Sequence, residues 1–245
     1  MKKIFIAILV LTVIGAVITI GSINYIVKAG IEKFGPKITR TTVTVGSVNL
    51  SPLSGSGSIS DLVVGNPEGF KAEHIFKLSK ISFKLDTSSL MAKNIIINDI
   101  SIESPDIVYE LNQGGTNLDE LLRAVRSSSY QNSTEVSSGE KSGEYPEKKV
   151  VIENLKIMSG NITLAASLLN SESAGASTIL PDIHLKDIGK TSGGATFPEA
   201  ITKVITAVSK KVATVSLDPN NLKGAADGLK GTLDGAADKL KGLFD

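Results

Sequence analysis

The sequence predicts an α+β fold: an N-terminal transmembrane helix followed by a curved, mainly antiparallel β-sheet with amphipathic helices packed on it. An uncharged, largely apolar run covers residues 4–27. Between residues 41 and 189, short segments place apolar residues at every second position, which is the period of half-buried strands. From residue 196 onward, apolar residues recur every three or four positions, which is the period of an amphipathic helix.

The apolar run at the N-terminus predicts a membrane anchor over residues 1–28. As a helix rising about 1.5 Å per residue, residues 4–27 span roughly the 30 Å core of a bilayer. The basic start, Lys2 and Lys3, also fits a cleaved signal peptide. The run is longer than the roughly 7–15 apolar residues of such a peptide, however, and no small-x-small cleavage site closes it. We therefore expect an uncleaved anchor.

Residues 29–40 predict a juxtamembrane helix, with Gly35-Pro36 as its stop signal. Two alternatives stay open for this segment. In one, the apolar residues Ile26, Ile31 and Phe34 dip into the membrane interface, and in the other the segment is a solvated linker helix. Lysines flank the apolar run on both sides, so the positive-inside rule gives conflicting advice about orientation.

The first block of strands carries the candidate binding residues. Residues 41–50 predict the first strand, and a Gly-Asn-Pro-Glu-Gly turn at residues 65–69 follows the second. In the next two strands, the apolar positions of one face are Ile81, Phe83, Leu85, Ile100 and Ile102. After Ser104-Pro105 the apolar parity changes. This change predicts a bulge or a sharp corner, because proline cannot donate to a strand ladder.

A helix and a second block of strands complete the predicted sheet domain, residues 41–195. Asn117, with Glu120 three residues later, is the predicted N-cap of a short helix. Residues 127–149 are polar with almost nothing apolar, so we expect a disordered loop. Alternation resumes over residues 147–189, where Gly160-Asn161 predicts a two-residue hairpin. Short connections predict a mainly antiparallel sheet of about seven or eight strands.

Residues 196–245 predict C-terminal amphipathic helices. Thr196 and Glu199 form a capping box, and an apolar stripe follows at Ile201, Val204, Ile205, Val208, Val212 and Val215. Residues 224–234 and 235–245 repeat an eleven-residue pattern that places leucines and alanines on one side of a helix. Each of its glycines costs about 0.8–1 kcal/mol relative to alanine. We therefore expect this segment to fold against a protein partner or a lipid surface, with a frayed solvated tail as the alternative.

Composition argues against several classes of site. The 245 residues contain no cysteine, which removes disulfides, thiolate metal sites and cysteine nucleophiles. A net charge of +1 provides no basic field for nucleic acid. His74 and His184 lack neighbours at metal-ligand spacing, and neither a P-loop nor a Gly-x-Ser-x-Gly elbow occurs. We predict no catalytic, cofactor or metal site, no nucleic-acid partner and no enzymatic activity.

Five short motifs follow one another between residues 55 and 122: Gly55-x-Gly-x-Ile-x-x-Leu, Asn66-Pro-Glu-Gly-Phe, Lys77-Leu-x-x-Ile-x-Phe-x-Leu-Asp, Ile100-x-Ile-x-x-Pro-x-Ile-x-Tyr-Glu and Asn117-Leu-x-x-Leu-Leu. In this order and spacing they resemble the AsmA family, membrane-anchored proteins of Gram-negative bacteria that face the periplasm. The resemblance covers about the first half of the chain. The long repetitive middle of the large family members is missing from this sequence.

The resemblance implies a single-pass inner-membrane protein, held by residues 4–27, with its N-terminus in the cytoplasm and its body in the periplasm. Family members are associated with lipid transport and outer-membrane assembly. We accordingly expect a non-enzymatic protein that holds phospholipid in an apolar groove lined by Ile81, Phe83, Leu85, Ile100 and Ile102. The alternative expectation is a structural module whose sheet is closed by its own helices and whose C-terminal helix docks a partner protein.

Overall fold

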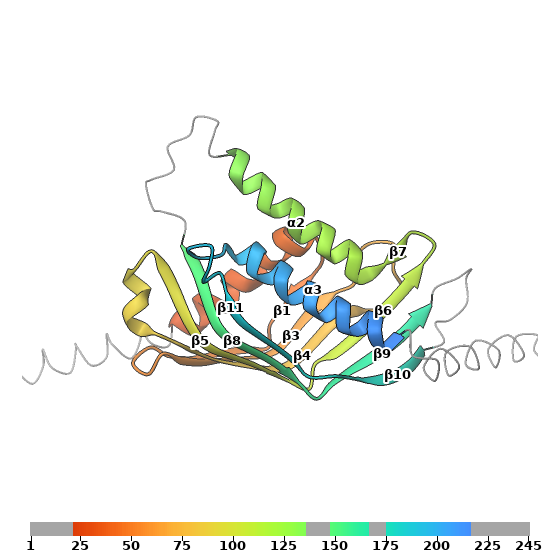
Figure 1. Ribbon diagram of the computed structural model, residues 1–245, viewed down its shortest axis with the longest axis horizontal. Coiled ribbons are helices and arrows are strands. Elements are labelled where there is room, and N and C mark those ends of the chain that lie inside the picture. Colours follow the sequence, from red (N-terminus) through yellow and green to blue (C-terminus); the bar gives the residue numbers. More distant parts are fainter. Residues whose placement is uncertain (1–21, 136–147, 167–174, 217–245) are drawn as a thin grey trace, which may run out of the picture.

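A computed structural model describes residues 22–135, 148–166 and 175–216, which form one sheet and the helices around it (Figure 1). Most of the predicted anchor, part of the predicted loop and the whole C-terminal repeat lie outside these residues. Within the described ranges, no helix is both long enough and apolar enough to cross a bilayer. The anchor over residues 4–27 therefore stays a prediction.

The sheet curls into a half-barrel with α2 and α3 on its concave side (Figure 1). In the described part of the chain it has 11 strands in the order β10-β9-β6-β4-β5-β8-β11, with β3 beside β4, β1 and β2 beside β3, and β7 beside β6. The strand bounds are β1 Val43–Thr44, β2 Ser47–Ser51, β3 Ser56–Gly65, β4 His74–Leu85, β5 Asn94–Glu103, β6 Asp106–Asn112, β7 Gly115–Thr116, β8 Lys149–Met158, β9 Gly160–Ala166, β10 Gly175–Leu180 and β11 Ile183–Ile188. The predicted combination of a curved sheet with packed helices is confirmed.

The sheet is mixed, although most neighbouring strands are antiparallel as predicted. β5 pairs with β8 and β6 pairs with β9 in parallel. Parallel neighbouring strands need a long crossover connection, whereas the predicted sheet has only short connections. Here the crossover runs from β6 through α2 (Asn117–Glu135) to β8. The strand count exceeds the expected seven or eight partly because long strands break in two.

Three of the long strands bend along one line, which we call the crease. It passes through Ser104-Pro105 between β5 and β6, Ser159 between β8 and β9, and Pro181-Asp182 between β10 and β11. Ser104 and Ser159 adopt the left-handed region, with φ of 48° and 54°. The Ser104 N–H donates to the Met158 carbonyl at 2.9 Å, so neighbouring bends lie side by side. The sharp corner predicted at Ser104-Pro105 is confirmed.

The hairpin predicted at Gly160-Asn161 is wrong. β8 and β9 run in the same direction as one bent strand, because β8 pairs with β5 and β9 with β6. Gly160 instead serves a close approach: a Cβ there would lie 2.9 Å from Leu180 Cδ2 and 3.0 Å from Pro105 Cγ. The missing side chain lets two buried residues meet at the crease.

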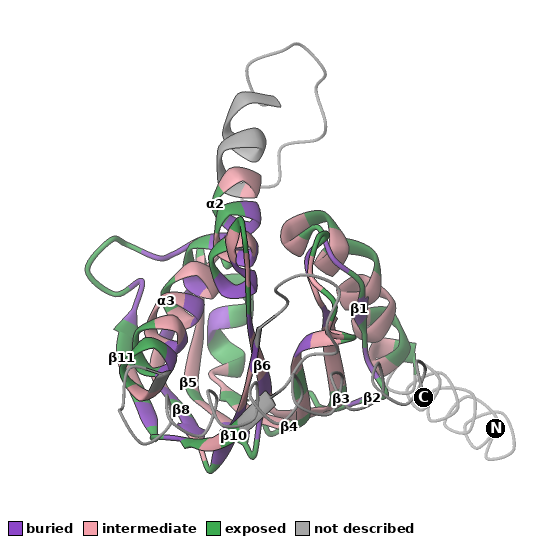
Figure 2. Ribbon diagram, turned by 90° about the vertical axis from the view of Figure 1, so that its right-hand side faces the viewer, coloured by how far each residue is buried: buried purple, intermediate pink, exposed green. Residues whose placement is uncertain are grey.

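A helix over residues 22–39 lies along the edge of the sheet that β1 and β2 form (Figure 2). These two strands, separated at Gly46, replace the single strand predicted over residues 41–50. Side chains spaced four residues apart bond the edge backbone: Asn24 accepts from the Leu50 N–H (2.9 Å), Lys28 donates to the Gly46 carbonyl (3.0 Å), and Glu32 accepts from the Val45 N–H (3.0 Å). Free edge groups promote aggregation, so these bonds protect the edge. Neither alternative for the juxtamembrane helix included this docking on the sheet.

α2 (Asn117–Glu135) is longer than the short helix predicted from its sequence. Residues 127–135, assigned to a disordered loop, are helical, and β8 already begins at Lys149. The predicted N-cap is also wrong by one residue. Thr116 precedes the helix, and its Oγ1 accepts from the Asp119 N–H at 3.1 Å. Asn117 is drawn away from the capping role by a buried polar network described below.

α3 (Phe197–Ser216) confirms the helix predicted from the capping box. The Thr196 N–H donates to Glu199 Oε2 (2.8 Å), and the Glu199 N–H donates to Thr196 Oγ1 (3.3 Å). In the predicted apolar stripe, Ile205, Val208 and Val212 are buried. β-branched residues have poor intrinsic helix propensity, so packing on the sheet is what stabilises this helix.

The hydrophobic core lies between these two helices and the strands that they cover (Figure 2). α3 packs on β8, β10 and β11, and α2 packs on α3, β6 and β7. The largest fully buried apolar side chains are Ile75, Ile107, Leu118, Leu121, Ile162, Leu180, Val125, Val150 and Val212. Burying one such side chain contributes about 1.5–3 kcal/mol. The core is thus concentrated under α2 and α3, towards one side of the half-barrel.

Candidate functional site

The five predicted binding residues lie on one face of the sheet. Ile81 pairs with Ile102, Phe83 with Ile100, and Leu85 with Ile97 across the β4–β5 ladder. The same rows continue into β8, where Ile102 pairs with Ile157 and Ile100 with Leu155. Because Ile157 and Leu155 belong to the core under α3, this face is the concave one. The shared face predicted from the two-residue period is therefore observed.

The cover over this face is uneven. Ile102 is 8% exposed and belongs to the core, whereas the other four residues are only partly buried. Ile81 and Ile100 still contact the edge of the core cluster. Ile59 of β3 pairs with Ile81 and extends the row outward. We call the partly buried set Ile59, Ile81, Phe83, Leu85 and Ile100 the open strip.

The open strip is a partly buried surface of the sheet. Among the described residues, one hollow of about 780 Å³ lies between the end of the N-terminal helix and residues 65–73, and a second of about 460 Å³ lies between β11 and α3. Neither is lined by a residue of the open strip. A ligand on the strip would therefore lie along the sheet and remain partly in contact with its surroundings.

Phe83 owes its position to the glycine opposite it. Gly57 of β3 pairs with Phe83, and a Cβ at Gly57 would lie 2.4 Å from Phe83 Cζ and 2.8 Å from Leu50 Cδ2. The ring therefore lies across the space that the glycine leaves empty. Gly57 was not among the predicted site residues, and only the antiparallel register shows that it faces Phe83.

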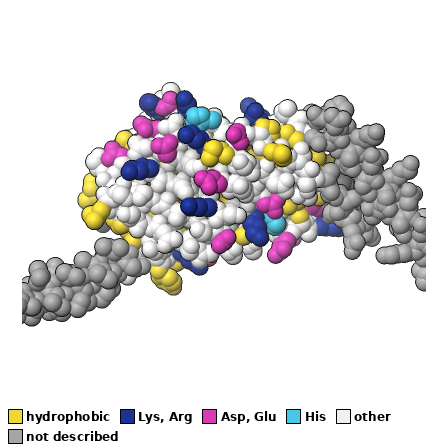
Figure 3. Space-filling view, turned by 90° about the horizontal axis from the view of Figure 1, so that it is seen from below, with side chains coloured by type: hydrophobic (Ala, Val, Ile, Leu, Met, Phe, Trp, Pro, Cys, Tyr) yellow, Lys and Arg dark blue, Asp and Glu magenta, His cyan; other side chains and the backbone are white. Residues whose placement is uncertain are grey.

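The opposite, convex face is polar. Ser82 pairs with Ser101 and Lys84 with Asp99 on β4 and β5, in alternation with the apolar rows. Figure 3 shows charged side chains of both signs scattered over this face. A sheet with one wet face must bury the other against something apolar, which here is α2 and α3 over part of the area.

A buried polar network holds the Asn66–Phe70 loop against the sheet. Both oxygens of Glu110, which is 0% exposed, accept from the Lys71 N–H (2.8 and 3.0 Å), and Oε2 also accepts from the Ala72 N–H (2.9 Å). Oε2 accepts in addition from Asn66 Nδ2 at 2.7 Å. Asn117, also 0% exposed, donates to Asn66 Oδ1 (2.9 Å) and accepts from the Glu110 N–H (3.0 Å). Buried polar groups are tolerated when they are satisfied in this way.

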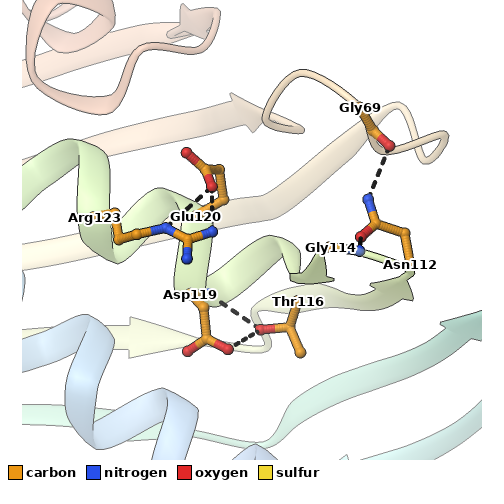
Figure 4. Close-up of polar contacts among 7 residues, drawn as sticks. All are labelled: Gly69, Asn112, Gly114, Thr116, Asp119, Glu120 and Arg123. Carbon is orange, nitrogen blue, oxygen red and sulfur yellow. Dashed lines mark hydrogen bonds and ion pairs between the residues drawn. The ribbon is translucent and has the colours of Figure 1, made fainter.

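This network explains why three separate sequence motifs belong together. Asn66, Glu110 and Asn117 each sit in a different motif, and the fold brings them into contact. The end of β6 is further tied to the same loop, and a local bond closes the start of α2 (Figure 4). Asn112 Nδ2 donates to the Gly69 carbonyl (3.0 Å), and Thr116 Oγ1 donates to Asp119 Oδ2 (2.7 Å). Glu120, the other half of the predicted cap, pairs instead with Arg123. The network is structural, since its polar atoms bond one another.

Two histidines and one tyrosine among the described residues have surroundings that bear on the predicted absence of a site. His74 Nε2 lies 3.4 Å from Asp106 Oδ2, and His184 is exposed on the polar side of β11. In the described ranges, no three His, Asp or Glu side chains gather where they would hold a metal ion. Burial, and then the charge of Asp119, raise the pKa of Tyr109 above its usual value, while a hydrogen bond with Thr116 opposes this shift. This tyrosine packs against the core, so the shift reports its burial.

Comparison with known proteins supports the relationship that the motifs indicated. The family model described as the AsmA family matches residues 1–240, well beyond the first half of the chain to which the motifs are confined. A search of curated protein sequences found no match. The match covers nearly the whole sequence, and the motif residues Asn66, Glu110 and Asn117 meet in one buried network. The chain belongs to the AsmA family.

Proposed function

We propose that this chain is a non-enzymatic cell-envelope protein that holds phospholipid acyl chains on the open strip. Membership of the AsmA family is consistent with a role in envelope lipid handling or outer-membrane biogenesis. In this proposal residues 4–27 anchor the chain in the inner membrane and the sheet lies in the periplasm. The chain acts as a binding surface, without a cofactor or metal.

The observation that carries the proposal is a single row of isoleucines that passes from covered to open. In the order of the strands, the row is Ile183, Ile157, Ile102, Ile81 and Ile59. Ile183, Ile157 and Ile102 are 4%, 3% and 8% exposed, while Ile81 and Ile59 are only partly buried. Covering apolar surface is favourable by about 25 cal/mol per Å². Beyond Ile59 the row reaches Val48, which is 5% exposed, so an acyl chain would gain that free energy along the partly buried segment of Ile81 and Ile59.

A photocrosslinking experiment tests the proposal on the full-length protein in its own membrane. Phe83 is replaced by the photoreactive residue p-benzoylphenylalanine in cells grown with radiolabelled phosphate. Lys84 is the matched control, because it is the next residue of β4 and points to the polar face. We expect a radiolabelled, phospholipase-sensitive adduct from position 83 and little from position 84. Equal labelling at the two positions, or none at position 83, would contradict lipid binding on the open strip.

A structural module is the competing function, and one observation favours it: the core under α2 and α3 is already filled. In that case the open strip is a surface for another protein. The same crosslinking experiment separates the two, because a partner protein gives an adduct at position 83 that shifts the mass by a whole polypeptide and resists phospholipase.

A further inference from the structure

One end of the sheet presents large apolar side chains to its surroundings. Leu53, in the turn between β2 and β3, is 96% exposed. Leu90 and Met91, in the short helix η1 (Thr87–Met91) between β4 and β5, are 42% and 94% exposed. We call Leu53, Leu90 and Met91 the rim. Exposing several large apolar side chains to water side by side is unfavourable, and patches of such side chains mark interaction surfaces.

Hydrogen bonds place the two turns of the rim beside each other and beside the first described residues. The Leu85 N–H, just before η1, donates to the Gly55 carbonyl of the β2–β3 turn at 2.8 Å. The Leu50 N–H, just before the same turn, donates to Asn24 of the N-terminal helix at 2.9 Å. Figure 1 shows η1, the β2–β3 turn and the start of the N-terminal helix together at one end of the half-barrel.

The η1 part of the rim is held firmly in its exposed position. Asp86 caps η1, accepting from the N–H and Oγ of Ser88 at 2.9 and 2.7 Å, and these bonds lower the pKa of Asp86. Lys148 Nζ donates to the carbonyls of Leu90 (3.0 Å) and Ala92 (2.7 Å). The exposure of Leu90 and Met91 is therefore a feature of a well-bonded turn.

Lysines flank the rim, and the carboxylate next to it, Asp86, is bonded within η1 to Ser88. Lys148 bonds the η1 turn directly, and Lys93 follows it and is exposed. The turn residues 51–55 and 87–93 contain no aspartate or glutamate. Apolar side chains flanked by lysines suit the boundary of a bilayer with anionic phosphates, where basic residues reach the headgroups and apolar ones reach the acyl region.

The position of the uncharged run identifies the partner of this surface. Residues 4–21 precede the N-terminal helix directly in sequence, and that helix starts at the rim end. Its first turns also expose Tyr25 (74%) and Ile26 (63%), of the kinds of residue that settle at membrane interfaces. A bilayer that holds residues 4–27 must lie next to this end of the sheet.

We propose that the rim rests in the headgroup region of the bilayer that holds the anchor, with Leu53, Leu90 and Met91 inserted and Lys93 and Lys148 at the phosphates. The open strip then begins at the membrane, because Leu85 and Phe83 lie on the part of β4 nearest η1. The inference rests on the anchoring part of the proposed function and does not require that the strip holds lipid.

The chain has no cysteine, so single cysteines report individual positions in the full-length protein. Leu53→Cys, Leu90→Cys and Met91→Cys variants are labelled with a polarity-sensitive fluorophore and reconstituted into nanodiscs of phosphatidylethanolamine and phosphatidylglycerol. Some of the lipids carry a nitroxide just below the headgroup. The matched control is Leu111→Cys, since Leu111 is 44% exposed, close to the 42% of Leu90, and lies at the far end of the β5–β6 strand.

We expect blue-shifted emission and several-fold stronger nitroxide quenching at positions 53, 90 and 91 than at position 111. Circular dichroism of each labelled protein confirms that the sheet is intact. Equal quenching at the rim and at position 111, whether strong or absent, overturns the placement. Flotation of the same proteins with liposomes tests the anchor separately: a chain that does not float overturns anchor and rim together. A chain that floats but shows no quenching at positions 53, 90 and 91 overturns only the placement of the rim in the membrane. The photocrosslinking result at position 83 does not depend on either outcome.

Discussion

Ile157 and Ile81 occupy the same cross-strand row of the concave face, yet Ile157 is 3% exposed beneath α3 and Ile81 is only partly buried. The strands β8 and β11 pack against α3, whereas neither α2 nor α3 is a main neighbour of β3 or β4. Both regions follow the same two-residue alternation. The two-residue alternation of a strand therefore shows which face of the sheet is apolar, whereas the positions of the helices decide how much of that face is covered.

The largest expected change in the free energy of unfolding comes from a matched pair of truncations, one in each region. Ile157→Ala removes a buried side chain from the core, and we expect it to lower the free energy of unfolding by about 2–5 kcal/mol. Ile81→Ala removes the same atoms from the open strip, and we expect less than half of that loss, because part of the site already meets its surroundings. Urea denaturation of the full-length protein in detergent, followed by circular dichroism, measures both. Equal losses would show that the strip is as well packed as the core.

A second test releases the structure at the start of α2. In Glu110→Gln the amide oxygen can replace only one carboxylate oxygen, so the network loses either the 2.8 Å bond from Lys71 or the bonds that Oε2 accepts from Ala72 and Asn66, and the new N–H₂ faces a donor instead of an acceptor. An unsatisfied buried donor costs about 1–3 kcal/mol, and we expect a loss in this range. Faster hydrogen exchange in the first turns of α2 would accompany it. Glu68→Gln, in the same loop but exposed, is the control, and a loss no larger than the control's would refute the structural role of the network.

A third test compares two glycines, one in each region. In Gly160→Ala the new methyl group would meet Leu180 and Pro105, which are both buried, and overpacking of this kind costs about 1–3 kcal/mol. In Gly57→Ala the clash with Phe83 is closer, at 2.4 Å, but the ring can turn outward from the open strip. We expect the smaller loss of stability at Gly57 and a change in the crosslinking yield at position 83. A larger loss at Gly57 would mean that Phe83 is fixed.

The smallest expected effect is a dependence of the unfolding free energy on alkaline pH, caused by Tyr109 on the covered side. Burial raises the pKa of Tyr109 above its usual value of 10.0, so the folded state keeps a proton that the unfolded chain releases. This contribution to stability is complete below pH 10 and is lost as the pH rises through the folded pKa. We expect Tyr109→Phe to flatten the alkaline decline in unfolding free energy, and Tyr25→Phe, at an exposed site, to leave it unchanged. An identical decline in both variants would assign it to other groups.

Several elements could be predicted from the sequence because they depend on local chemistry. The capping box at Thr196 and Glu199 produces α3, since both bonds lie within four residues. The parity change at Ser104-Pro105 marks the crease, because a strand can reverse its faces only through a bend. The common face of Ile81, Phe83, Leu85, Ile100 and Ile102 follows from the strand period alone.

Other features were missed because they depend on which strands meet. Gly160-Asn161 carries a turn signal, yet parallel pairing with β5 and β6 keeps the chain running in one direction. Asn117 has good capping chemistry, yet Asn66, 51 residues away in sequence, takes its amide. Thr116 then supplies the cap. In both cases a long-range bond overrides a local preference of about 1 kcal/mol.

The sequence by itself determined the apolar face, the presence of α2, the cap and buried stripe of α3, the corner at Pro105, and the motifs of the AsmA family. The tertiary structure alone decided the parallel crossover, the Asn66–Glu110–Asn117 network, the docking of residues 22–39 on the sheet edge, and the contrast between the covered and the open parts of one row. The physical reason is the separation along the sequence over which each kind of interaction acts. Periodicity and capping act between residues a few positions apart, whereas burial depends on which distant segments pack together.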